Sequence, residues 1–94
     1  MISVSVRYHN MLKRRAGTRG ETLELPDGSQ IHDALQEMSA RHGPQLHEML
    51  FTPDGEVAPH LVVFCNSKLV PRDRAEFALA DGDELMLFPA TSGG

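Results

Sequence analysis

Few side chains of this 94-residue chain have the type and spacing that side-chain chemistry requires. Its single cysteine, Cys65, lies inside an apolar run, and free cysteines in such runs are mostly buried, so we interpret it as a core residue. A reactive thiol would need exposure and a lowered pKa. One cysteine also excludes an internal disulfide and fits a reducing compartment.

The histidines form no recognisable ligand motif. The pair His47-Glu48 begins like the helix motif of zinc proteases, but Phe51 stands where the second histidine is required. We therefore expect no metal site among the five histidines, which are scattered along the chain: His9, His32, His42, His47 and His60.

Neither the acidic residues nor the glycines indicate catalysis or nucleotide binding by this chain. Asp81 and Asp83 flank Gly82, a pattern typical of a tight turn rather than of paired catalytic carboxylates. The stretch 17–20 lacks the spacing and the Lys-Ser/Thr pair of a phosphate-binding loop.

The remaining group that could take part in a reaction is the α-carboxylate of Gly94. The paired glycines Gly93-Gly94 give a thin backbone that can pass close to another protein's surface. We interpret Gly94 as the reactive end of the molecule, and Thr91, Ser92 and Gly93 as a tail that threads into a partner. The alternative is a frayed terminus, which is the common fate of small-residue ends.

Composition indicates one small domain with a modest core. The chain carries 13 acidic and nine basic residues and a formal charge of −4, which argues against nucleic-acid binding and against an anionic membrane surface. It begins with an alternating pattern rather than a signal peptide and has no run of membrane-spanning length, so we expect a cytoplasmic protein. Residues 1–88 are expected to fold, and residues 89–94 to form a flexible tail.

Hydrophobic periodicity predicts an α+β architecture, with a mixed sheet of about five strands packed on one main helix. The first and last strands are expected side by side in the middle of the sheet. Asn10 and Ser29 are the predicted N-caps of a short and a long helix. The predicted strands are 2–8, 22–25, 61–65, 68–70 and 84–88, and the predicted helices are 11–16 and 30–41, followed by a helical turn over 46–51.

Two apolar groups lie outside this regular pattern. Phe77 and Leu79 are expected to fill the core from an irregular connection. On the last strand, Met86 and Phe88 point away from the face that carries Leu85 and Leu87, which predicts an exposed docking surface beside the tail. The alternative is a second small core under residues 44–60.

The residues 1–8, 21–28 and above all 80–94, which read Ala-Asp-Gly-Asp-Glu-Leu-Met-Leu-Phe-Pro-Ala-Thr-Ser-Gly-Gly, resemble the MoaD/ThiS sulfur carriers. The chain is most similar to the small subunit of molybdopterin synthase. This resemblance implies the ubiquitin-like β-grasp fold.

The resemblance also implies a mechanism. An E1-like adenylating enzyme would activate the Gly94 carboxylate with ATP, and a sulfur donor would convert it to a thiocarboxylate. ATP and its metal would be supplied by that partner, because no cofactor is expected on this chain. The sulfur would pass to an acceptor enzyme, most naturally in molybdopterin (molybdenum cofactor) biosynthesis. The chain would then not be catalytic alone but the small subunit of a molybdopterin synthase-type complex.

Other readings stay open at this point. The same chemistry serves cysteine biosynthesis with a cysteine synthase-like acceptor, tRNA thiolation and other sulfur-containing metabolites. A ubiquitin-like modifier or binding module is a further alternative, and a small enzyme using Cys65 or a histidine is a third. The chain has Cys65-Asn66-Ser67 where the carriers often have Val-Asn-Gly, and its loop 51–60 is longer than in a compact molybdopterin-type carrier.

Overall fold

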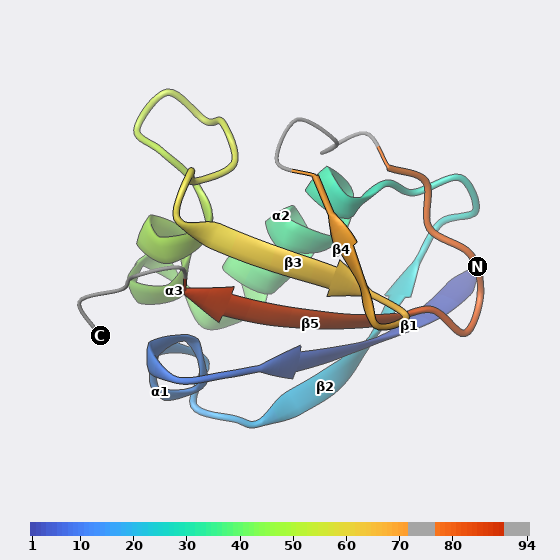
Figure 1. The fold of residues 1–94 in the computed structure, drawn as a ribbon, viewed down its shortest axis with the longest axis horizontal. Coiled ribbons are helices and arrows are strands. Elements are labelled where there is room, and N and C mark those ends of the chain that lie inside the picture. Colours follow the sequence, from blue (N-terminus) through green and yellow to red (C-terminus); the bar gives the residue numbers. More distant parts are fainter. Residues whose placement is uncertain (72–76, 90–94) are drawn as a thin grey trace.

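The computed structural model describes residues 1–71 and 77–89, which form one mixed five-stranded sheet with helices on one face (Figure 1). The elements follow in the order β1 (Ile2–Tyr8), α1 (Met11–Ala16), β2 (Gly20–Leu25), α2 (Ile31–His42), α3 (Pro44–Leu50), β3 (Leu61–Cys65), β4 (Lys68–Val70) and β5 (Glu84–Pro89). Within these residues, no helix is long and apolar enough to cross a membrane.

The strand order is β2-β1-β5-β3-β4, so the first and last strands lie side by side at the centre, as predicted. They are parallel, whereas the other neighbouring pairs are antiparallel. A parallel pair needs a crossover, and α2 with α3 supplies it on one face of the sheet (Figure 1). The last strand therefore pairs on both sides over residues 85–87 and with β3 alone at Phe88 and Pro89.

The core lies between the sheet and the helices. Val4, Val6 and Tyr8 of β1 are buried while the residues between them are exposed or only partly covered, as period-two alternation predicts. Leu85 and Leu87 of β5 are fully buried and join the same cluster. On α2, the buried residues recur with helical spacing and so form one apolar stripe: Ile31, Ala34, Leu35 and Met38.

The helix caps differ from the predictions. Gln30, not Ser29, caps α2, because the Ser29 hydroxyl is buried and donates to the Pro26 carbonyl at 2.7 Å. Gln30 instead forms a capping box with Asp33, whose carboxylate accepts the Gln30 backbone N–H at 2.8 Å. Asn10 occupies the N-cap position of α1, as predicted, but its side chain makes no capping bond and its φ is 55°.

Of the two apolar residues expected to fill the core from the irregular connection before β5, only one is buried. Leu79 is 6% exposed, which confirms that prediction, but Phe77 is 36% exposed, so its prediction was wrong. The Phe77 carbonyl accepts the Ile31 N–H at 3.0 Å, and the Leu79 N–H donates to the Ser29 carbonyl at 2.9 Å. The segment is thus fastened to the start of α2 through its backbone, and only Leu79 turns into the core.

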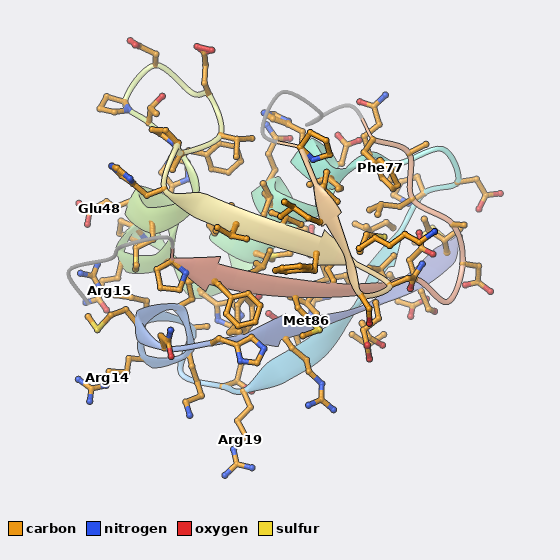
Figure 2. All side chains as sticks on the ribbon, in the orientation of Figure 1. Arg14, Arg15, Arg19, Glu48, Phe77 and Met86 are labelled. Carbon is orange, nitrogen blue, oxygen red and sulfur yellow. The ribbon has the colours of Figure 1, made fainter. Side chains whose placement is uncertain are left out.

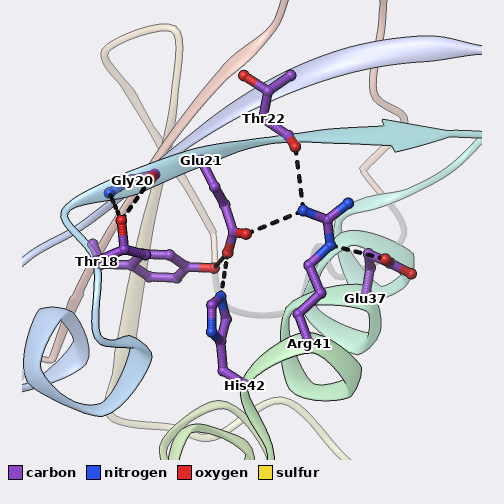
Figure 3. Close-up of polar contacts among 8 residues, drawn as sticks. Thr18, Gly20, Glu21, Thr22, Glu37, Arg41 and His42 are labelled. Atoms are coloured by element: carbon purple, nitrogen blue, oxygen red, sulfur yellow. Dashed lines mark hydrogen bonds and ion pairs between the residues drawn. The ribbon is translucent and has the colours of Figure 1, made fainter.

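A polar cluster around Glu21 joins the sheet to the end of α2 (Figure 3). The Glu21 carboxylate accepts hydrogen bonds from the Tyr8 hydroxyl and from His42 Nε2, each at 2.5 Å, and from the Arg41 guanidinium at 3.1 Å. The Glu21 side chain is 15% exposed. Burial by itself raises the pKa of its carboxyl, but the bonds from Tyr8 and His42, with the neighbouring charges, leave the pKa below its usual value.

The β3–β4 hairpin has a two-residue turn in which both residues are left-handed. Asn66 has a φ of 53° and Ser67 a φ of 71°, so the serine itself adopts the conformation that glycine prefers. The Asn66 side chain accepts the Glu84 backbone N–H at 3.0 Å and donates to Asp83 at 2.9 Å. These bonds fasten the turn to the start of β5 and stabilise the turn conformation.

Candidate functional site

The predicted alternation of β5 is confirmed, and it leaves Met86 and Phe88 on the sheet face that carries no helix. Leu85 and Leu87 are fully buried against the helices, whereas Met86 and Phe88 are half-buried. Neither side chain is as exposed as the sequence suggested, because neighbouring strands contribute apolar side chains beside them.

These neighbours form an apolar patch on the open face. Met86 pairs with Phe64, and Phe88 pairs with Val62, across the β3–β5 ladder. Directly paired residues share a sheet face, so all four side chains lie together. The rings of Phe64 and Phe88 pack edge to face at 5.7 Å. We call Val62, Phe64, Met86, Phe88 and His9 the open-face patch.

His9 completes the patch from the end of β1. Its ring stacks on Phe88 with the centroids 4.2 Å apart and the planes within 7°. Its backbone N–H donates to the Leu87 carbonyl at 3.2 Å, so the ring is held beside the end of β5. The alternative of a second core under residues 44–60 is not what the structure shows, since the ring contacts of Phe88 come from His9 and Phe64.

Sequence reasoning missed Val62, Phe64 and His9. The run 61–65 is apolar throughout and so gives no period-two signal, whereas β3 in the structure alternates between buried and half-buried residues. A usable signal existed, because a chain with one long helix covers only one face of a five-stranded sheet. His9 carries no such signal, since its contact depends on the register of β1 against β5.

The patch lies at the end of β5 from which the chain continues toward its C-terminus. β5 runs through Pro89, one residue beyond the predicted stop, and Pro89 pairs with Leu61. Pro89 was predicted to begin the flexible tail 89–94, and it belongs to β5 instead. The other predicted tail residues, 90–94, which include Thr91, Ser92, Gly93 and Gly94, lie outside the described residues.

The other residues considered for chemistry have structural roles. Cys65 is 5% exposed, and its burial and the adjacent Asp83 raise the pKa of the thiol, which confirms a core residue. Asp83 accepts the Ala80 N–H at 2.8 Å within the predicted turn. Asp81 accepts the Ser3 N–H at 2.7 Å instead, so its carboxylate joins the turn to β1. Among residues 1–71 and 77–89, no three metal-ligating side chains gather closely enough to hold an ion.

Comparison with known proteins agrees with this architecture. The model of the ThiS family matches residues 6–94. Small archaeal modifier protein 1 of Haloferax volcanii is 35% identical over 79 residues, covering 84% of this chain and 86% of that protein. A molybdopterin synthase sulfur carrier subunit from Chlamydomonas reinhardtii is 31% identical over 93 residues, covering 99% of this chain and all of that protein.

Solved structures give the same result. The crystal structure of SAMP1 from Haloferax volcanii superposes with a TM-score of 0.85 at 33% identity, covering 98% of this chain and 99% of that chain. The mixed sheet with β1 parallel to β5 and one long helix is thus the expected ubiquitin-like β-grasp fold. With the family matched over nearly the whole chain, this protein belongs to the ThiS family of ubiquitin-like sulfur carriers.

Proposed function

We propose that this protein carries sulfur as a thiocarboxylate on Gly94, and that it does so in molybdopterin biosynthesis. The observation that carries the proposal is the family match, which extends through residue 94 and so includes the Gly93-Gly94 pair. The full-length similarity to a molybdopterin synthase sulfur carrier subunit supports the choice of pathway.

The chemistry divides between this chain and its partners. A carboxylate is a poor electrophile, so an E1-like enzyme joins it to AMP from ATP and releases pyrophosphate. The outer sulfur of a persulfide on the sulfur donor then attacks the acyl-adenylate, and AMP leaves. A thiol cleaves the resulting acyl disulfide, which frees the thiocarboxylate and leaves a disulfide on the donor. The thiocarboxylate gives its sulfur to the precursor on the large subunit of the synthase, and water returns the carboxylate. This chain supplies the carboxylate and the body by which partners recognise it.

The body suits such a role because the anchored strand and the proposed reactive end are close in sequence. Six residues follow Phe88, and an extended chain of that length reaches about 20 Å. Phe88 and Met86 are half-buried in the open-face patch, and apolar side chains gathered on an uncovered face are typical of a docking surface. We propose that the patch contacts the adenylating enzyme and then the acceptor enzyme while Thr91, Ser92 and Gly93 thread Gly94 into the active site.

The test is intact-mass analysis after incubation with the E1-like enzyme of the source organism, ATP and a sulfur donor. The expected product is heavier by the exchange of one oxygen for one sulfur, located on the C-terminal peptide. A variant lacking Gly94 and a variant with one residue added after it should both stay unmodified while keeping the folded far-UV spectrum. A thiocarboxylate on either variant, or none on the unaltered chain, would refute the proposal.

A second candidate function is protein modification, favoured by the 35% identity to a protein named small archaeal modifier protein 1. It uses the same activated Gly94, but a lysine amine attacks the acyl-adenylate and an isopeptide forms. Lysine-linked adducts of this chain in cells, absent when Gly94 is deleted, would support it. Thiocarboxylate formation with no adducts would favour sulfur transfer, for molybdopterin or for the alternatives of cysteine biosynthesis, tRNA thiolation and other sulfur metabolites.

A further inference from the structure

We propose that Arg7 and Arg19 form a binding site for carboxylates of an acidic loop on the adenylating partner. The site lies on the open face of the sheet, next to the open-face patch. The identity of the partner rests on the proposed function. The site adds that the partner presents a negatively charged surface to this face of the sheet.

The first observation is the segregation of charge along the chain. Residues 7–19 contain five of the nine basic residues and none of the 13 acidic ones: Arg7, Lys13, Arg14, Arg15 and Arg19. The rest of the chain therefore carries 13 acidic and four basic side chains. An acidic protein that gathers its positive charge at one place has a local potential opposite to its net charge.

The second observation is that the fold brings the two ends of this segment together. Arg7 pairs with Gly20 across the β1–β2 ladder, and the Arg19 carbonyl accepts the Tyr8 N–H at 2.8 Å. Both arginine side chains are exposed, and neither has a carboxylate within ion-pair distance among the described residues. The two arginine residues thus lie close together at the end of the β1–β2 ladder, and both line the same hollow.

The third observation is a shallow hollow of about 420 Å³ between them. Gly20 forms part of its floor, and a Cβ there would lie 2.6 Å from the Val6 carbonyl oxygen, so a larger residue could not replace it without a backbone shift. The rest of the lining consists of Ser5, Val6, Glu21, Thr22 and Glu84. The Glu21 carboxylate is already bound by Tyr8, His42 and Arg41, which offset its negative charge. Glu84 pairs with Ser5, two residues along the ladder from the pair of Arg7 and Met86, and its negative charge repels a ligand carboxylate toward the end of the hollow that carries the arginines.

Neighbouring basic residues extend the positive surface without forming the hollow. Lys13 and Arg14 are exposed on α1, and Figure 2 shows Arg14 and Arg19 projecting from the end of the molecule that carries α1. Arg15 is different, because it donates to the Gln45 carbonyl at 3.0 Å and lies 3.7 Å from the Glu48 carboxylate. We assign Arg15 to the packing of α1 on α3 and not to the site.

A protein surface fits this region better than a nucleic acid. Arg7 pairs with Met86, which pairs with Phe64, so the guanidinium adjoins an apolar patch of the kind that protein interfaces bury. A nucleic-acid backbone extending beyond the arginines would meet the excess of acidic residues on the rest of the chain. A complementary partner would therefore place apolar side chains on the open-face patch and acidic ones at the hollow, which speeds association and sets orientation.

A peptide titration tests the site without any enzyme. The probe is a hexaglutamate peptide added to the ¹⁵N-labelled full chain at low salt, followed by amide chemical shifts. Shifts should concentrate at Arg7, Arg19 and Gly20 and disappear in the R7Q/R19Q variant. The K68E variant is the matched control, because it changes net charge by the same amount at the exposed β4 edge, and it should behave like the unaltered chain. Shifts spread evenly over the surface, or equal in both variants, would overturn the site.

Association with the adenylating enzyme tests the partner. At low salt, R7Q/R19Q should associate roughly tenfold more slowly than K68E, and the difference should vanish at high salt as charges are screened. Equal association rates would overturn the proposal. A filter-binding assay with tRNA tests the alternative of a nucleic-acid site. Loss of tRNA retention by R7Q/R19Q with no change in enzyme association would also overturn the proposal. Failure of the proposed function is distinct, because the unaltered chain would then form no thiocarboxylate whatever the peptide titration shows.

Discussion

The Glu21 cluster allows a quantitative prediction about what holds the sheet to α2. Replacing Glu21 with glutamine keeps the shape of the side chain but removes the charge that faces Tyr8, His42 and Arg41. A hydrogen bond to a charged group contributes about 1.5–3 kcal/mol. The Tyr8 hydroxyl belongs to a residue that is 2% exposed, so water cannot replace the lost partner.

We therefore expect Glu21→Gln to lower the free energy of unfolding by about 3 kcal/mol and Tyr8→Phe to lower it by about 2 kcal/mol. For a domain of this size, 1 kcal/mol corresponds to about 4–8 °C in Tm. The two changes share one bond, so the double variant should lose less than the sum. We expect a coupling energy of about 1.5 kcal/mol.

The assay is urea unfolding at pH 7, followed by far-UV circular dichroism. Tyr8 is the only tyrosine and the chain has no tryptophan, so tyrosine fluorescence gives a second probe at the cluster in chains that keep Tyr8. The matched control is Glu37→Gln, which removes a 3.0 Å contact to Arg41 from a side chain that is 40% exposed and should cost less than about 0.5 kcal/mol. A coupling energy below about 0.5 kcal/mol, or equal losses for Glu21→Gln and Glu37→Gln, would refute the reasoning.

Three further predictions follow from the same structure. The pKa of Glu21 in the folded state lies below its ordinary value near 4.5. The Glu21 carboxylate therefore stabilises the fold fully above pH 4.5, and this stabilisation is lost as the pH falls through the folded-state pKa. Unfolding curves of the unaltered chain and of Glu21→Gln should converge in acid. Ser67→Gly should raise the free energy of unfolding by about 0.5–1 kcal/mol, because Ser67 has a φ of 71°, and a loss of stability measured in urea would contradict this. Phe88→Asp should keep the free energy of unfolding within about 1.5 kcal/mol of the unaltered value but slow thiocarboxylate formation at least roughly tenfold. The control Leu69→Asp changes a residue that is 61% exposed and should slow the reaction little. Equal rates for both variants would argue against docking through the patch.

Local patterns in the sequence determined most of the elements. The alternation in residues 2–8 and 84–88 specified two strands and the face that each buries, because side chains in a strand alternate between faces whatever the strand pairs with. The apolar stripe of α2 and the glycine after α1 are equally local, since helical periodicity and the left-handed C-cap at Gly17 involve residues within one or two turns. Burial of Cys65 followed from the same kind of reasoning.

Tertiary structure decided what lies beside what. Three contacts depend on strand register. His9 stacks on Phe88, and Glu21 binds Tyr8 and His42. Arg7 pairs with Gly20, which places it beside Arg19. Register is set by contacts between residues far apart in the chain, which no local pattern encodes. The choice of Gln30 over Ser29 as the cap has the same origin, because the neighbouring turn engages the serine hydroxyl. The sequence by itself thus determined which residues are apolar, basic or acidic. Only the packing of one helical layer on a five-stranded sheet decided that one face stays open and that the open-face patch and the arginines lie together on it.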